Sequence, residues 1–496
     1  MSALAEKLDT KEITSLSETN SMASNTILIN GDWISAEQTM HITNSFDESI
    51  IATVSCATNE HVKQAIASAT QAFKSNRHKP SSERAAWLKS AAAKIAARIN
   101  EFAQIIALET GKPIAAAHKE VTRCVNTLNL SAEEATRLTG ETIKFDSFAG
   151  GENRLGYYEH VPLGVIVAIT PFNDPLNLAA HKLGPAIAAG NSVILKPSQQ
   201  APLSAIKLVE VLIESGLPKG QVNVLTGFAR DFAEQLVSSN DVAMVTYTGG
   251  EASAEIIAKN AGIKKLAMEL GANSPVIVMS DCNIDKAVES CVSGSYWAVG
   301  QNCIGVQRIY IEEAIYDDFK AKFVEQTTRL KVGSQLNESN DIGPMINETE
   351  AIRIENWVKQ ATNKGANLLV GGKRQGACYF PTALDNVSDT DNLVCQEAFG
   401  PVVSLFPFTD LDDTIALANN VDFSIHGAVF TSNINTAMKV SRELEVAGVM
   451  VNDSSDYRLD AMPFGGAKRG SMGREGVKFA IKEMSQTKVF CMNLDS

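Results

Sequence analysis

The sequence lacks the features that define several classes of protein. Its eight cysteines form no CxxC pair and do not cluster with its seven histidines, so neither a zinc site nor a disulfide framework is indicated. No apolar run reaches the roughly 20 residues of a membrane-spanning helix. The formal net charge of −13 gives no overall attraction for nucleic acid or an anionic membrane. We therefore expect reduced thiols, a cytoplasmic location, no metal, and neither nucleic acid nor membrane as partner.

The start of the chain also lacks the pattern of a secretory signal. The first residues are polar and rich in Ser and Thr, and no basic segment is followed by an apolar block. We expect residues 1–25 to be a polar N-terminal tail in front of the folded part of the chain.

What the chain does contain is an alternation of helices and strands. Residues 26–35 predict two short strands around an Asn-Gly turn, and the spacing of apolar residues between 60 and 145 predicts helices. Strands rich in Val, Ile and Leu alternate with helices over 163–272 and again over 275–453. Such strands form parallel sheets covered on both faces. The first series has the doubly wound pattern that binds nucleotides beyond the carboxyl ends of its strands.

No GxGxxG motif accompanies this pattern, so other residues must bind the nucleotide. Gly249 and Gly250 lie between an apolar strand and a helix, where glycine allows a phosphate to approach and the helix N-terminus favours negative charge. An ordinary turn explains these two glycines equally well. Lys196 ends an apolar strand in "LKPS", and its amine is costly to bury unless an anion or a ribose hydroxyl meets it.

Three further residues each have a chemical and an ordinary structural interpretation. Cys303, in "GQNCIGVQR", is either a small core residue or a nucleophile on a tight loop. Glu269, at an apolar strand end before a glycine turn, is either an exposed carboxylate or a general base whose pKa is raised by burial. Asn173, between two prolines, is either a turn residue or a fixed donor to a developing oxyanion.

Taken together, these stretches resemble the aldehyde dehydrogenase superfamily over residues 26–490. The matching segments, in order, are "TPFNDPLNLAAHKLGPAIAAGNSVILKPS", "YTGG", "MELGANSP", "GQNCIGVQR", "QEAFGPV" and "MPFGGAKRGSMGREG". The resemblance implies an α/β fold with a Rossmann-like dinucleotide-binding domain at 26–147 and 161–273 and an α/β catalytic domain at 274–465. It also implies a small β oligomerisation arm at 148–160 and 466–496, in a homodimer or homotetramer.

The resemblance gives the three reactive residues defined roles. Cys303 would attack the aldehyde carbon and carry a thioester after hydride transfer to the nicotinamide. Asn173 and the backbone N–H of Cys303 would stabilise the oxyanion, and Glu269 would activate the water that hydrolyses the thioester. Relatives that pass the acyl group to coenzyme A tend to lack this carboxylate, so Glu269 favours release of a free acid.

The implied cofactor is NAD, with NADP also open. By resemblance, Lys196 and Glu397 would each hold a ribose and Gly249 would lie at the pyrophosphate. NAD-preferring relatives often have glutamate at position 199, which would repel a 2′-phosphate, whereas the Gln199 found here would not. The expected cofactor-binding residues are Thr170, Pro171, Phe172, Lys196, Ser198, Gln199, Gly227, Gly249, Gly250, Leu270, Gly271, Glu397 and Phe399.

The substrate is indicated by two arginines. The segment 119–141 resembles a helix of the subgroup that acts on lactaldehyde, phosphonoacetaldehyde or glyceraldehyde 3-phosphate. Arg123 in this segment, and Arg458 in "SSDYRLDAMPFGG", stand where relatives place arginines that bind a substrate anion. Both being ordinary surface residues is the alternative. Asn302 replaces an arginine of some phosphate-using relatives, which weakens the phosphosugar interpretation.

The favoured reaction is therefore oxidation of a small anionic aldehyde, sulfoacetaldehyde or phosphonoacetaldehyde, to the carboxylic acid. Lactaldehyde, glyceraldehyde 3-phosphate and succinate semialdehyde stay open as substrates. A non-catalytic binding or structural protein that retains the fold is the alternative from a different class. The presence of Cys303, Glu269 and Asn173 together argues against that alternative.

Overall fold

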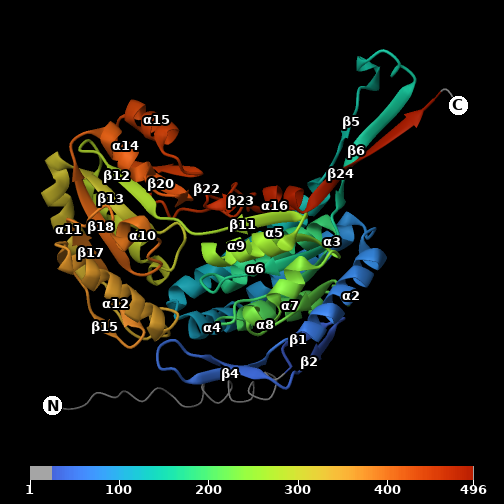
Figure 1. The fold of residues 1–496 in the computed structure, drawn as a ribbon, viewed down its shortest axis with the longest axis horizontal. Coiled ribbons are helices and arrows are strands. Elements are labelled where there is room, and N and C mark those ends of the chain that lie inside the picture. Colours follow the sequence, from blue (N-terminus) through green and yellow to red (C-terminus); the bar gives the residue numbers. More distant parts are fainter. Residues whose placement is uncertain (1–24, 495–496) are drawn as a thin grey trace.

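The computed structural model describes residues 25–494 and shows two lobes with a projecting arm (Figure 1). The sequence prediction of an α/β protein with a Rossmann-like lobe, a second α/β lobe and a β arm is confirmed. The predicted N-terminal tail lies outside the described residues, apart from residue 25. Within residues 25–494, no helix is both long and apolar enough to cross a membrane.

The first lobe is built on an eight-stranded sheet in the order β2-β1-β9-β8-β7-β10-β11-β23. Its strands are β1 (Ile27–Ile29), β2 (Asp32–Ile34), β7 (Val165–Ile169), β8 (Ser192–Lys196), β9 (Val222–Val224), β10 (Val242–Thr248), β11 (Lys265–Glu269) and β23 (Ser471–Met472). Strands β7 to β11 run parallel. The predicted hairpin in 26–35 is confirmed as β1 and β2, and it joins the sheet antiparallel to β9.

Helices cover both faces of this sheet, which explains why its parallel strands are apolar without alternation. These helices are α2 (Asn59–Asn76), α3 (Ser81–Ala97), α4 (Ile99–Thr110), α5 (Ile114–Arg137), α6 (Pro175–Ala189), α7 (Leu203–Glu214), α8 (Ala229–Ser238), α9 (Glu251–Ala261) and α16 (Val477–Glu483). Helix α6 is buried along its whole length and carries His181 and Lys182 into the interior. A hairpin of β3 (Thr39–Thr43) and β4 (Ile50–Ser55) lies beside the lobe.

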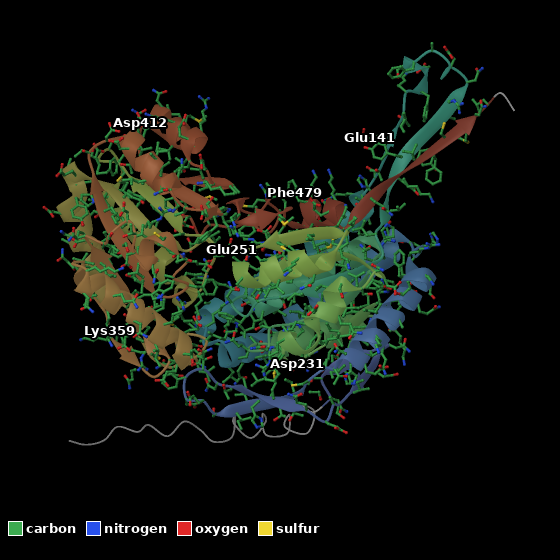
Figure 2. The ribbon with its side chains drawn as sticks, viewed as in Figure 1. Glu141, Asp231, Glu251, Lys359, Asp412 and Phe479 are labelled. Atoms are coloured by element: carbon green, nitrogen blue, oxygen red, sulfur yellow. The ribbon has the colours of Figure 1, made fainter. Side chains whose placement is uncertain are left out.

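The second lobe has a seven-stranded sheet in the order β14-β17-β18-β13-β12-β20-β21. Its strands are β12 (Ser274–Val278), β13 (Val306–Glu312), β14 (Asn367–Val370), β17 (Thr382–Asp385), β18 (Val402–Phe408), β20 (His426–Phe430) and β21 (Gly448–Val451). Its helices are α10 (Ile284–Tyr296), α11 (Tyr316–Thr328), α12 (Glu348–Asn363), α13 (Asn392–Cys395), α14 (Leu411–Asn419) and α15 (Ile434–Glu443). Charged side chains such as Lys359 and Asp412 lie on its outer surface (Figure 2).

The arm is a three-stranded sheet of β24 (Ser485–Asn493), β6 (Arg154–Pro162) and β5 (Glu141–Thr142) that projects away from both lobes (Figure 1). It therefore begins later in the C-terminal segment than the expected residue 466. Strand β23 instead pairs with β11, and α16 packs on the first lobe because Val477 and Ile481 join its core. Short two-stranded pairs complete the second lobe: β15 (Arg374–Gln375) with β16 (Cys378–Tyr379), and β19 (Phe423–Ser424) with β22 (Ala467–Lys468).

The arm exposes large apolar side chains, which predicts that another copy of the chain covers them. Tyr157, Val489 and Met492 are 42%, 58% and 49% exposed. We expect light scattering after gel filtration to give an oligomer for the unaltered protein and a lower mass for Val489→Asp. Leu417→Asp on α14, where Leu417 is 49% exposed, is the control and should leave the mass unchanged. A monomeric unaltered protein would contradict this prediction.

Candidate active site

A cavity of about 1310 Å³ opens between the two lobes at the carboxyl ends of β7, β8, β10 and β11. The first lobe contributes the last residues of these strands and the turns that follow them, and the second lobe contributes Cys303, Glu397 and Arg458. Ligands of doubly wound sheets bind at this edge, where parallel strands end together. The residues predicted for catalysis and for binding the aldehyde all line this one cavity, and they are Asn173, Glu269, Cys303, Arg123 and Arg458.

Cys303 follows a strained turn. In the preceding segment, Trp297–Gly300, the non-glycine residues Ala298 and Val299 have φ values of 49° and 63°. Valine rarely adopts such a conformation, and strain of this kind is found where a site must hold one geometry. The Cys303 side chain packs against the cluster that contains Ile304 and Phe464. Its backbone amide has no hydrogen-bond acceptor among the described residues, so the amide is free to donate to a bound oxygen.

The surroundings of the Cys303 thiol disfavour its ionised form. Burial raises its pKa well above the usual range for a thiol, and the Glu397 and Glu269 carboxylates raise it further. The Arg458 guanidinium acts in the opposite direction. Because the thiolate is the nucleophilic form, a nearby group must take the proton when the thiol reacts.

Glu269, the last residue of β11, is placed to accept a proton. Its side chain is almost fully buried, and its Oε2 atom has no hydrogen-bond partner among the described residues. Burial raises its pKa well above the ordinary carboxyl value, and the nearby Glu475 raises it further, against the lowering effects of Lys182 and Arg458. A carboxylate with a raised pKa is a better base near neutral pH than an ordinary surface glutamate.

Asn173 lies in the turn between β7 and α6, with its side chain partly exposed to the cavity. The next residue, Asp174, is fixed by ion pairs to Lys112 and Arg123. This anchor holds the backbone of the turn, while the Asn173 amide keeps no hydrogen bond to another described residue. The side chain can therefore donate to an oxygen bound beside Cys303.

The expected cofactor residues line the other part of the same cavity, with two exceptions. Lys196 ends β8 with its amine nearly buried, which lowers its pKa to about 8. Gly250 is the N-cap of α9, so the positive end of the helix dipole faces the cavity. The other lining residues are Thr170, Pro171, Phe172, Ser198, Gln199, Gly249, Leu270, Glu397 and Phe399.

The two exceptions are Gly227 and Gly271. A Cβ on Gly227 would meet Cys56 at 2.9 Å, so this glycine allows close packing beneath the site. A Cβ on Gly271 would meet Oε2 of Glu397 at 2.4 Å, so this glycine makes room for that carboxylate. Glu397 accepts a hydrogen bond from the Ala272 amide, and burial raises its pKa to about 7. The buried amine and carboxylate, the glycine-bordered helix N-terminus and the size of the cavity fit a dinucleotide.

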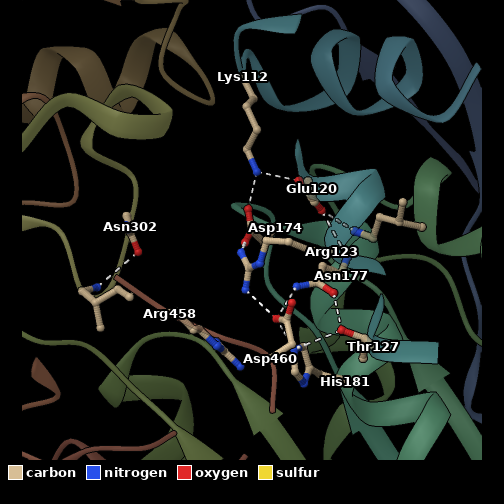
Figure 3. A network of polar contacts seen from close by, with 12 residues as sticks. Lys112, Glu120, Arg123, Thr127, Asp174, Asn177, His181, Asn302, Arg458 and Asp460 are labelled. Carbon is tan, nitrogen blue, oxygen red and sulfur yellow. Dashed lines mark hydrogen bonds and ion pairs between the residues drawn. The ribbon is translucent and has the colours of Figure 1, made fainter. Parts of the chain in front are cut away.

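Arg123 belongs to a network that the sequence did not reveal (Figure 3). Its Nη1 donates to Asp174 at 3.0 Å and its Nη2 donates to Asp460 at 2.9 Å. Asp460 also contacts His181 of α6 at 2.9 Å. Both terminal nitrogens of Arg123 are thus occupied by protein carboxylates, although the side chain still reaches the cavity. Asp174 follows directly after Asn173 in "TPFNDP", and this adjacency was the available signal for it.

Arg458 is less completely engaged. Its Nη2 contacts Glu475 at 3.1 Å, and its guanidinium carbon lies 3.6 Å from the centre of the Phe464 ring. Its Nε has no hydrogen-bond partner among the described residues. Glu475 is also paired with Lys182. Burial alone would raise the pKa of Glu475, but Lys182 and Arg458 outweigh this effect and lower the pKa to about 2. Lys182 in the largely apolar helix α6 was the sequence signal for this pair.

The raised pKa of Cys303 predicts a steep pH dependence of alkylation. We expect labelling by iodoacetamide, followed by peptide mass spectrometry, to accelerate continuously between pH 7 and 10. Arg458→Gln should slow labelling several-fold at pH 8 because it removes the cation that lowers this pKa, roughly tenfold for each pKa unit. Exposed Cys491 on the arm is an internal control. A rate for Cys303 that is constant above pH 7 would contradict the prediction.

Comparison with known proteins identifies the family. The aldehyde dehydrogenase family model matches residues 33–490. An aspartate-semialdehyde dehydrogenase 1 of Pseudomonas canavaninivorans is 51% identical over 458 residues, covering 92% of this chain and 97% of that protein. A 3-sulfolactaldehyde dehydrogenase of Priestia aryabhattai is 44% identical over 468 residues, covering 94% and 98%.

A solved structure agrees with these matches. The glyceraldehyde-3-phosphate dehydrogenase GapN of Methanocaldococcus jannaschii, complexed with NADP, superimposes with a TM-score of 0.89 at 37% identity, covering 92% of this chain and 100% of that one. The family model spans the whole of the second lobe and the first lobe from residue 33 onward. The chain belongs to the aldehyde dehydrogenase family and is an NAD(P)-dependent oxidoreductase that acts on an aldehyde.

Proposed function

We propose that this enzyme oxidises a short aldehyde bearing an acidic group to the corresponding carboxylic acid. The observation that carries the proposal is Arg458, a nearly buried arginine that lines the same cavity as Cys303 and has donors left over after pairing with Glu475. A buried guanidinium with unused donors is a site for a substrate carboxylate or sulfonate.

The proposed chemistry uses residues that line this cavity. The Cys303 thiol releases its proton to solvent water as its sulfur attacks the aldehyde carbon, and Asn173 with the Cys303 amide stabilises the resulting oxyanion. The bound NAD(P)+ supplies the hydride acceptor. Glu269 then takes a proton from the water that attacks the Cys303 thioester, which releases the acid and restores the thiol.

The charge of the substrate group is limited by the carboxylates around Arg123. Because Asp174 and Asp460 already occupy its terminal nitrogens, a dianion would compete with two protein carboxylates for the same donors. This arrangement favours a carboxylate or sulfonate over a phosphonate or phosphate. Of the two substrates favoured by the sequence, sulfoacetaldehyde is therefore preferred to phosphonoacetaldehyde. The names of two relatives, aspartate-semialdehyde and 3-sulfolactaldehyde dehydrogenase, likewise denote acidic aldehydes.

The proposal predicts that Arg458 discriminates between charged and neutral aldehydes. A screen of initial rates should give higher kcat/KM for sulfoacetaldehyde and succinate semialdehyde than for propanal. Arg458→Ala should lower kcat/KM for the acidic aldehydes by one to two decades, since a charge-assisted hydrogen bond contributes about 1.5–3 kcal/mol. Propanal has no acidic group that Arg458 could bind, so the substitution should leave its kcat/KM nearly unchanged. Equal losses for charged and neutral aldehydes would exclude an acid-binding role for Arg458.

The assigned catalytic roles predict two distinct defects. Cys303→Ser should abolish NAD(P)H formation, because a serine hydroxyl is a much weaker nucleophile without a dedicated base. Glu269→Gln should preserve a burst of one NAD(P)H per site and slow later turnover by about 10²-fold or more. Stopped-flow absorbance at 340 nm separates the two phases. Unchanged steady-state turnover in Glu269→Gln would overturn its role as base.

Gln199 predicts the balance between the two cofactors. With no carboxylate at this position, NAD should be used and NADP tolerated. Gln199→Glu should lower kcat/KM for NADP relative to NAD by about tenfold, because it places a negative charge beside the 2′-phosphate. Gln200→Glu, at the neighbouring cavity residue, is the matched control. The same ratio in both variants would mean that position 199 does not face the 2′-phosphate.

A further inference from the structure

The loop that carries Arg458 presents a second charged residue to the cavity. Asp456 and Arg458 stand two residues apart in the segment between β21 and β22, and both line the cavity that contains Cys303. The two side chains have opposite charges. One loop therefore offers an acceptor and a donor to the same bound molecule.

Among the described residues, Asp456 has no ion-pair partner, in contrast to Asp174 and Glu475 beside Arg123 and Arg458. Asp174 pairs with Lys112 and Arg123, and Glu475 pairs with Lys182 and Arg458. Within residues 25–494, no ion pair of Asp456 is found. Its polar neighbour is the Ser454 hydroxyl, and none of the described cations forms an ion pair with its carboxylate.

The surroundings of Asp456 make this lack of a partner costly. The side chain is largely buried, which raises its pKa, and the neighbouring Asp453 raises it further. Lys119 is the cation nearby that acts in the opposite direction, but its amine lies over the Trp297 ring, 4.6 Å from the ring centre. A cation on the substrate would compensate the Asp456 charge where the protein does not.

We propose that Asp456 binds the ammonium group of a zwitterionic substrate whose carboxylate is held by Arg458. The substrate class is then a short α-amino acid with an aldehyde at the other end, which reaches Cys303. This inference rests on the proposed function and narrows it from acidic aldehydes to amino-acid semialdehydes. Asp456 is the specificity-determining residue, because Arg458 alone would accept any short aldehyde acid.

Two probes of equal chain length test the inference. Aspartate semialdehyde and succinate semialdehyde share a carbon chain and a carboxylate, and they differ in the α-ammonium group. For the unaltered holoenzyme we expect kcat/KM to be at least about tenfold higher with aspartate semialdehyde. An equal or higher value with succinate semialdehyde would overturn the inference.

Substitutions at Asp456 then test whether this residue causes the preference for aspartate semialdehyde. Asp456→Asn keeps the shape and removes the charge, so the ratio of the two kcat/KM values should fall about tenfold or more, mainly through KM for aspartate semialdehyde. Asp456→Glu, which restores the charge, should recover part of the ratio. Asp412→Asn, at a surface carboxylate of α14 that does not line the cavity, is the control and should keep the ratio. An unchanged ratio in Asp456→Asn would overturn the inference.

Two further kinds of substrate distinguish a failure of this inference from a failure of the proposed function. Lactaldehyde and 3-sulfolactaldehyde carry a hydroxyl in place of the ammonium, and the amide oxygen of asparagine can still accept a hydrogen bond from it, although more weakly than a carboxylate. A preference for these substrates that survives Asp456→Asn would overturn the ammonium assignment while leaving the oxidation of acidic aldehydes intact. If propanal is oxidised as well as every acidic aldehyde, the proposed function itself fails.

Discussion

The ion pairs of Arg123 with Asp174 and Asp460 are the constraint on which the geometry of this site depends. They join helix α5, the turn after β7 and the segment before β22, which are far apart in the sequence. Buried charges are stable only when fully paired, so loss of one partner would leave the others uncompensated. The turn that presents Asn173 and the loop that presents Arg458 are thereby held against the same helix.

The architecture was predictable because it depends on local patterns. Strands buried on both faces must be apolar throughout, and helices between them show their own period, so both lobes could be recognised along the chain. Cys303, Glu269 and Asn173 attracted attention because each stands at a turn beside an apolar segment, and the family resemblance then gave them their predicted roles. The network around Arg123 could not be found in this way, since the partner Asp460 is brought close only by the complete fold. For the same reason α16 was misplaced: its apolar face packs on α6, a contact that no local pattern specifies.

The part of the cavity around Arg123 and the part where the cofactor is expected differ in how their charged side chains are paired. Arg123 and Lys112 are paired with the carboxylates of Asp174, Asp460 and Glu120, which fixes these side chains in place. Where the cofactor is expected, the buried Lys196 and the half-buried Glu397 have no ion-pair partner among the described residues, and burial moves the pKa of each towards neutrality. Uncompensated groups of this kind reduce stability, and they are found where a ligand supplies the missing partner.

The pairing of β6 with β24 has a consequence for the biosynthesis of the protein. Pro162 pairs with Ser485, and Arg154 pairs with Asn493, so one strand of the arm is translated long before the other. The first lobe has the same dependence, because β23 closes its sheet beside β11. A nascent chain folds from its N-terminus as it is made. The edge of β6 that pairs with β24 therefore stays unpaired until residues 485–493 have been synthesised. Exposed edges recruit other strands, so this interval is when the chain most needs protection by a chaperone.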